Sequence, residues 1–80
     1  MSREEVFEGL KEIISGMRPQ TDLSNVNYDT ELVRDLGIDS LFMILLSLAV
    51  EEKFGMRFPD GAAALTTVGE VCDTVIASKA

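Results

Sequence analysis

The sequence contains no histidine and only one cysteine among its 80 residues. Without histidine, the chain lacks the commonest general base and the commonest zinc ligand of proteins. A single cysteine, Cys72, excludes an internal disulfide. Basic residues are also scarce, because seven Lys and Arg face fourteen Asp and Glu, giving a formal charge of −7. This balance disfavours nucleic acid and anionic membrane surfaces as partners and favours a basic protein partner.

Long apolar runs are missing as well. The longest, residues 41–50, is interrupted by Ser47, whereas a membrane span needs roughly 18 or more apolar residues. The opening MSREEVFE is acidic and lacks the basic start and apolar centre of a signal peptide, so we expect a cytoplasmic protein. The length fits one small domain over residues 1–80. We expect a monomer, with pairing of two copies through the apolar run left open.

Apolar residues at helical spacing predict three longer helices. The first covers residues 3–17, starts at a Ser2/Glu5 capping box and stops before Pro19. The second covers residues 40–53 and ends at Gly55. The last follows Thr67, and residues 62–65 predict a short additional helix. The predicted fold is all-α, an antiparallel four-helix bundle of three longer helices and one short helix, with a long loop between the first two.

The long loop, residues 18–39, is rich in turn-forming polar residues. Asn25, Asn27 and Asp29 resemble the start of a calcium-binding loop, but Thr30 stands where that motif needs glycine and Leu36 where it needs glutamate. We therefore predict no metal site. Apolar residues are expected to pin the loop to the bundle: Leu23, Val26, Tyr28, Leu32 and Leu36.

Ser40 follows Asp39 at the predicted start of the second helix. Asp39 suits the N-cap position, because its side chain can accept hydrogen bonds from free N–H groups of the first turn. A helix N-terminus is electropositive, so a phosphate joined to the Ser40 hydroxyl would be favoured there. Taken alone, such a pair is more often an ordinary helix cap. With the flanking residues considered next, Ser40 is a candidate attachment point.

The residues around Ser40, LGIDSL, resemble the attachment motif of acyl carrier proteins, in which the serine of Asp-Ser-Leu bears a 4′-phosphopantetheine arm. Three further segments, EEKFG at 51–55, FPD at 58–60 and TTVGEV at 66–71, fall at the spacing of that family. The resemblance implies a free-standing carrier that is not an enzyme. A phosphopantetheinyl transferase would move the arm from coenzyme A to Ser40, and the arm's thiol would hold an acyl group as a thioester. Asp39 would help to position the transferase's metal and coenzyme A.

The second helix is apolar on both faces. One face carries Met43, Leu46, Val50 and Phe54, and the opposite face carries Leu41, Leu45 and Leu48 with Glu52. The resemblance implies that the first face points inward and that the second surrounds the arm and meets enzymes. Ile38 and Met43 would border the path by which a chain enters the bundle. The predicted partner-binding residues are Asp35, Leu41, Phe42, Leu45, Leu48, Glu51 and Glu52.

Two residues depart from the family pattern. Phe42 and Leu45 stand where many carriers of fatty acid synthesis have acidic residues. This favours specialised polyketide-type synthesis over fatty acid synthesis, with an acyl ligase or acyltransferase and ketosynthase-type enzymes as partners. The other interpretation is that Phe42 and Leu45 pack against the long loop.

Three alternatives to an acyl carrier protein differ from it in the cargo or in the class of protein. An aminoacyl or peptidyl carrier of a nonribosomal peptide-type pathway is disfavoured by Ile38 and Asp39, because such carriers usually have a glycine pair before the serine. An unmodified helical interaction module would bind through Leu41, Leu45 and Leu48. An enzyme with a Ser40 nucleophile would lack a base at a recognisable spacing.

Overall fold

The computed structural model describes residues 2–58 and 65–79 of the chain. These residues contain three helices and no strand: α1 (Arg3–Met17), α2 (Ser40–Phe54) and α3 (Val68–Lys79). The three longer helices predicted from the sequence are confirmed, with α2 one residue longer than expected. The predicted short helix over residues 62–65 lies, apart from Leu65, outside the described residues. Within the described ranges, no helix has both the length and the apolar character needed to cross a bilayer.

The ends of the helices are set by local side-chain chemistry. At the start of α1, Ser2 Oγ accepts the Glu5 N–H over 3.1 Å and Glu5 Oε1 accepts the Ser2 N–H over 3.2 Å, which completes the predicted capping box. At the start of α3, Thr67 Oγ1 accepts the Glu70 N–H over 3.1 Å. Gly55 ends α2 with φ of 63°, a left-handed conformation that favours glycine. These caps satisfy backbone groups that a helix leaves unpaired.

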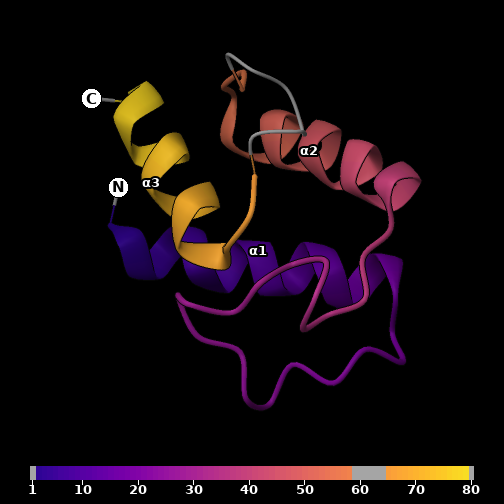
Figure 1. Cartoon of the computed structure of the whole chain (residues 1–80). Coiled ribbons are helices and arrows are strands. Elements are labelled where there is room, and N and C mark those ends of the chain that lie inside the picture. The colour runs from indigo at the N-terminus through magenta and orange to yellow at the C-terminus, as the bar shows by residue number, and fades with distance from the viewer. Residues whose placement is uncertain (1, 59–64, 80) are drawn as a thin grey trace.

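Figure 1 shows α2 running back over α1 in the opposite direction, while α3 rises from α1 at a steep angle. The contacts agree with this arrangement. Near the C-terminus of α2, Lys53 Nζ lies 3.6 Å from Glu12 Oε2 of α1. Near the N-terminus of α1, Arg3 Nε lies 3.1 Å from Asp73 Oδ1 of α3. Helices α1 and α2 are therefore antiparallel as predicted, whereas α3 lies at a steep angle to α1 instead of antiparallel to it.

The hydrophobic core lies between the three helices and the long loop. Its fully buried side chains come from all of these elements: Val6, Leu10, Ile14, Leu32, Ile38, Leu46, Val50, Val68, Val71, Cys72 and Val75. The loop is further tied to the start of α3, because the Thr30 and Tyr28 carbonyls accept the Val68 and Gly69 N–H groups over 2.9 and 2.8 Å. Leu23, Val26, Tyr28 and Leu36 pack against the core as partly buried side chains. The predicted pinning of the loop is confirmed.

Candidate functional site: the start of α2

Ser40 is the first residue of α2 and lies exposed at the surface. Asp39, in an extended conformation, is the N-cap, and its Oδ1 atom accepts the Phe42 N–H over 2.8 Å. The Asp39 carbonyl accepts the Met43 N–H over 2.9 Å, the first hydrogen bond of the helix proper. The N–H groups of Ser40 and Leu41 consequently point out of the helix end, as helix geometry requires. The predicted helix start and the predicted cap are both confirmed.

The second serine of α2 has a different environment. Ser47 is buried, and its hydroxyl donates to the Ile44 carbonyl over 2.7 Å. Its oxygen is therefore engaged inside the fold, whereas Ser40 stands at the surface beside free helix donors. The two serines differ in accessibility although they share one helix.

The turn that leads into Ser40 is fixed by backbone hydrogen bonds. Gly37 has φ of 67°, a left-handed conformation that favours glycine, and its N–H donates to the Val33 carbonyl over 3.1 Å. The next N–H, of Ile38, donates to the Leu32 carbonyl over 3.1 Å, and the Ile38 side chain is buried in the core. These hydrogen bonds and the buried Ile38 side chain fix the backbone just before Asp39 and Ser40, which lie at the surface.

A cleft of about 410 Å³ opens beside Ser40. Of the described residues that line it, all but Asp39 and Ser40 are apolar: Val33, Ile38, Met43, Ile44 and Leu65. Ile38 and Met43, which the sequence suggested as the border of a path into the bundle, both line this cleft. The exposed serine thus stands next to an apolar hollow that is open to solvent.

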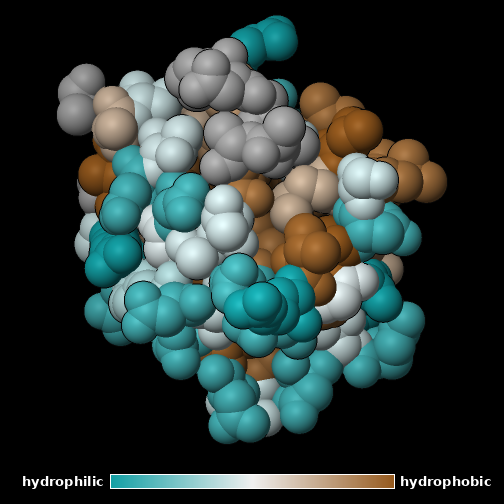
Figure 2. Space-filling model, in the orientation of Figure 1, coloured by the Kyte–Doolittle hydropathy of each residue, from teal (hydrophilic) through white to brown (hydrophobic). Residues whose placement is uncertain are grey.

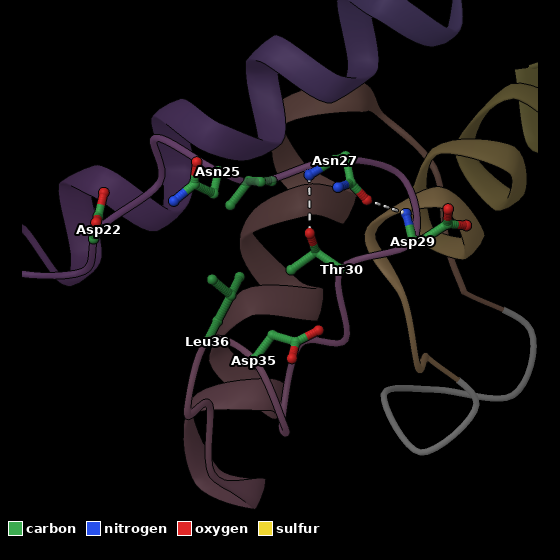
Figure 3. A pocket seen from close by; sticks show the side chains of 8 residues that line it. Asp22, Asn25, Asn27, Asp29, Thr30, Asp35 and Leu36 are labelled. Carbon is green, nitrogen blue, oxygen red and sulfur yellow. Dashed lines mark hydrogen bonds between the residues drawn. The ribbon is translucent and has the colours of Figure 1, made fainter.

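A larger and more polar hollow, of about 580 Å³, lies within the long loop (Figure 3). Several of its polar side chains form hydrogen bonds within the loop. Thr30 Oγ1 accepts the Asn27 N–H over 2.9 Å, and Asn27 Oδ1 accepts the Asp29 N–H over 2.8 Å. Asp22 accepts hydrogen bonds from the Ser24 hydroxyl and N–H, which lower the pKa of its carboxyl group. The size of this hollow therefore reflects how the loop is folded, and we place the candidate site at the cleft.

The outer face of α2 is apolar and exposed. Leu41, Leu45 and Leu48 keep 67%, 46% and 55% of their surface exposed, whereas Leu46 on the inner face keeps none. Ile44 and Val33 are exposed as well, and Figure 2 shows a band of hydrophobic residues on the side of the molecule where α2 lies. Each such side chain left in water forgoes roughly 1.5–3 kcal/mol of burial. The inner and outer faces of α2 are those that the family resemblance implied.

Phe42 and Leu45, the two residues that depart from the family pattern, have different surroundings. Phe42 is partly buried against the core, and the guanidinium carbon of Arg18 lies 5.2 Å from the centre of its ring. Leu45 stays exposed on the outer face. The interpretation that both residues pack against the long loop is therefore wrong for Leu45, while Phe42 packs against the core and beside the C-cap of α1.

The three carboxylates predicted to meet partners also differ in their hydrogen bonding. Asp35 Oδ2 accepts the Glu31 N–H over 2.8 Å, and Glu51 Oε2 accepts the Phe58 N–H over 2.9 Å. Both therefore stabilise backbone turns within the fold. Glu52 lies exposed near the end of α2.

Sequence reasoning missed several residues around Ser40. Val33 and Leu65 line the cleft although they lie outside α2, and no periodic pattern marks them. Ile44 could have been found, because it lies four residues after Ser40 and therefore on the same side of α2. Arg18 was missed as well, since only the folded chain brings it to Phe42 and to the Gly37 carbonyl.

Comparison with known proteins agrees with this geometry. The model of the phosphopantetheine attachment site family matches residues 9–75. An acyl carrier protein of Tropheryma whipplei is 38% identical over 81 aligned residues, covering 100% of this chain and 98% of the relative. Another, of Acidothermus cellulolyticus, is 40% identical, covering 94% of this chain and 89% of the relative. The meromycolate extension acyl carrier protein of Mycolicibacterium aurum is 40% identical, covering 88% of this chain and 72% of the relative.

These matches define a phosphopantetheine-bearing helical carrier, and the chain belongs to the acyl carrier protein family. The cofactor of this family is 4′-phosphopantetheine. Its members are carriers that serve biosynthetic enzymes and are not themselves enzymes.

Proposed function

We propose that this chain carries acyl intermediates as thioesters on a 4′-phosphopantetheine arm attached to Ser40. The observation that carries the proposal is the position of Ser40: exposed, first in α2, next to its N-cap Asp39 and at the edge of an apolar cleft. A phosphodiester at this point would lie at the electropositive end of α2 and near the outward N–H groups of its first turn. The residues present therefore fit the group.

The modification uses a simple exchange at phosphorus. Ser40 Oγ forms a bond to the phosphorus of coenzyme A that bears pantetheine, the phosphoanhydride bond breaks, and 3′,5′-ADP leaves while the serine proton is released. Asp39 holds the first turn in place through Phe42 and, as the family resemblance implies, faces the transferase's metal. The attached arm supplies the thiol that bears the acyl group.

The apolar cleft beside Ser40 is suited to shielding part of an acyl cargo. Its lining side chains Ile38 and Met43 are buried, while Ile44 and Val33 stand at its exposed rim. Apolar cargo would gain burial there at roughly 25 cal/mol per Å² of surface removed from water. This favours an acyl group over a charged aminoacyl group as cargo.

The outer face of α2 is proposed as the surface that meets partner enzymes. Leu41, Leu45 and Leu48 provide the apolar contact, and Glu52 provides a carboxylate at its far end. Phe42, Asp35 and Glu51 would contribute mainly by holding this surface in shape, since each is engaged within the fold. The partners are a phosphopantetheinyl transferase, an acyl ligase or acyltransferase, and ketosynthase-type enzymes in the cytoplasm.

The exposed Leu45 favours a specialised, polyketide-type pathway over standard fatty acid synthesis, because an apolar side chain replaces the usual acidic contact. One relative is named for meromycolate extension, so an acyl extension pathway is a further candidate. Loading assays that compare malonyl-type, long-chain acyl and aminoacyl donors would separate these pathways.

The experiment that tests the attachment is intact-mass measurement after incubation with a promiscuous transferase and coenzyme A. The wild-type chain should gain the mass of one phosphopantetheine group. Ser40→Ala should gain none, and Ser47→Ala, the matched serine of the same helix, should gain as much as the wild type. An unmodified wild-type chain, with the transferase active on another carrier, would remove the proposal and favour an unmodified interaction module.

A further inference from the structure

Arg18 connects the end of α1 to both sides of Ser40. Its backbone N–H donates to the Ile14 carbonyl over 2.8 Å, which makes Arg18 the C-cap of α1. Its Nη1 atom donates to the Gly37 carbonyl over 3.0 Å, three residues before Ser40. Its guanidinium carbon lies 5.2 Å from the centre of the Phe42 ring, two residues after Ser40. One side chain therefore bridges the turn that presents the serine.

Both contacts act on groups that determine where Ser40 lies. Gly37 has a positive φ and begins the short path from the loop to the cap at Asp39. Phe42 is the residue whose N–H is held by Asp39. A guanidinium is planar and always charged, so it can hydrogen-bond a carbonyl with its edge and contact an aromatic ring with its face. Because the Arg18 backbone belongs to the end of α1, these contacts tie the Ser40 turn to a rigid element.

We infer that Arg18 is a positioning residue for the modification of Ser40, holding the Gly37–Phe42 turn so that the serine hydroxyl is presented in one orientation. The inference rests on the proposed attachment to Ser40. Loss of Arg18 would leave α2 folded, because its cap and core contacts come from other residues, but would let the turn before Ser40 move. Transfer between two macromolecules is sensitive to such movement, since misplacement of a reacting group by about 1 Å can cost up to roughly 100-fold in rate.

The chain contains a matched control in Arg3. Its guanidinium carbon lies 4.1 Å from the centre of the Tyr28 ring, and its Nε atom lies 3.1 Å from Asp73 Oδ1. Arg3 therefore has the same kind of contacts as Arg18, a stacked aromatic ring and an oxygen acceptor. These contacts join α1 to the loop and to α3, away from the start of α2.

The test compares Arg18→Met and Arg3→Met with the wild type in two measurements. Initial rates of phosphopantetheine transfer, measured by intact mass at varied carrier concentration, should show kcat lowered roughly tenfold for Arg18→Met, with KM little changed. Arg3→Met should stay within about twofold of the wild type. In amide NMR spectra of the unmodified chain, the Ser40 and Leu41 resonances should shift in Arg18→Met and not in Arg3→Met. Arg18→Lys, which keeps a donor for the Gly37 carbonyl, should recover part of kcat.

Several results would overturn the inference. An unchanged kcat in Arg18→Met, equal losses in both variants, or unmoved Ser40 resonances would show that Arg18 does not position the serine. A change in KM alone would make Arg18 a contact for the transferase. If the wild-type chain itself is not modified, the proposed attachment fails first, and the inference fails with it.

Discussion

The Oδ1 atom of Asp39 accepts a hydrogen bond of 2.8 Å from the Phe42 N–H, and this contact fixes Ser40 as the first residue of α2. Asp39 thus has two roles that can be separated. As an N-cap it stabilises the helix, and as a carboxylate it is proposed to face the transferase's metal. Asparagine caps a helix about as well as aspartate but carries no charge.

We therefore expect Asp39→Asn to keep the free energy of unfolding close to the wild-type value while slowing phosphopantetheine transfer. Asp39→Ala should lower the free energy of unfolding by about 1 kcal/mol as well, because the cap is lost. Ser2→Ala removes the cap of α1 and is the control, with similar loss of stability and normal transfer. Urea denaturation and transfer rates measure the two effects. Wild-type transfer by Asp39→Asn would show that the carboxylate acts only as a cap.

Leu45 and Leu46 are neighbours in sequence but lie on opposite faces of α2. Leu46 is fully buried, so Leu46→Ala should lower the free energy of unfolding by about 2–5 kcal/mol. Leu45 is exposed, so Leu45→Ala should change stability by less than about 1 kcal/mol. If the outer face meets enzymes, Leu45→Ala should instead lower kcat/KM with the transferase by roughly fivefold, which corresponds to about 1 kcal/mol of contact. Unchanged kcat/KM in Leu45→Ala and in Leu41→Ala would argue against this face as the docking surface.

Gly69 allows α3 to approach the long loop closely. A Cβ atom at this position would lie 2.8 Å from the Tyr28 carbonyl oxygen and 2.9 Å from Arg3 Nη2. Because the first of these is a backbone atom, Gly69→Ala should lower the free energy of unfolding by about 1–3 kcal/mol. Gly16→Ala is the matched control in α1, where no described atom outside the adjoining helix backbone lies within 4 Å of the added Cβ, and it should raise stability by about 0.5 kcal/mol. Equal effects of the two substitutions in thermal denaturation would contradict this packing.

Cys72 makes the stability of the fold depend on alkaline pH. Burial raises the pKa of its thiol from an ordinary value of 9.0 to about 11, while Arg3 lowers this pKa and Asp73 raises it by smaller amounts. The unfolded chain loses the thiol proton above pH 9, whereas the folded chain keeps it until about pH 11. The contribution of the buried, protonated thiol to the free energy of unfolding is therefore fully present below pH 9 and is lost as the pH rises toward 11.

The expected result is that the free energy of unfolding of the wild type falls between pH 9 and 11 by more than that of Cys72→Ala. Urea denaturation at several pH values measures both. The comparison with Cys72→Ala removes every other pH-dependent contribution, because the two proteins share it. Parallel pH dependence of the two proteins would show that the thiol ionises as easily in the folded chain as in the unfolded one.

Local chemistry was sufficient to predict the helix ends and the position of Ser40. The Ser2/Glu5 capping box, the Asp39 cap and Gly55 act within a few residues, so their effects can be read from the sequence. Periodicity could not separate the two faces of α2, because both are apolar; the family resemblance did so. The surroundings of Phe42 include Arg18, which is distant in the sequence.

The cleft beside Ser40 was only partly predictable for the same reason. Ile38 and Met43 adjoin the serine in the sequence, whereas Val33 and Leu65 reach the cleft through the tertiary fold. Hydrogen bonds accepted by the Tyr28 and Thr30 carbonyls hold the start of α3 against the loop, and so bring Leu65 near Val33 although the two are far apart in the sequence. No pattern within a single helix contains this information.

The most direct measurement is to locate the added group after modification of the wild-type chain, by proteolytic digestion and tandem mass spectrometry. We predict one phosphopantetheine group, carried entirely on the peptide fragments that contain Ser40. A group found on Ser47, or on any other serine of the chain, would contradict the claim that the exposed first residue of α2 is the point of attachment.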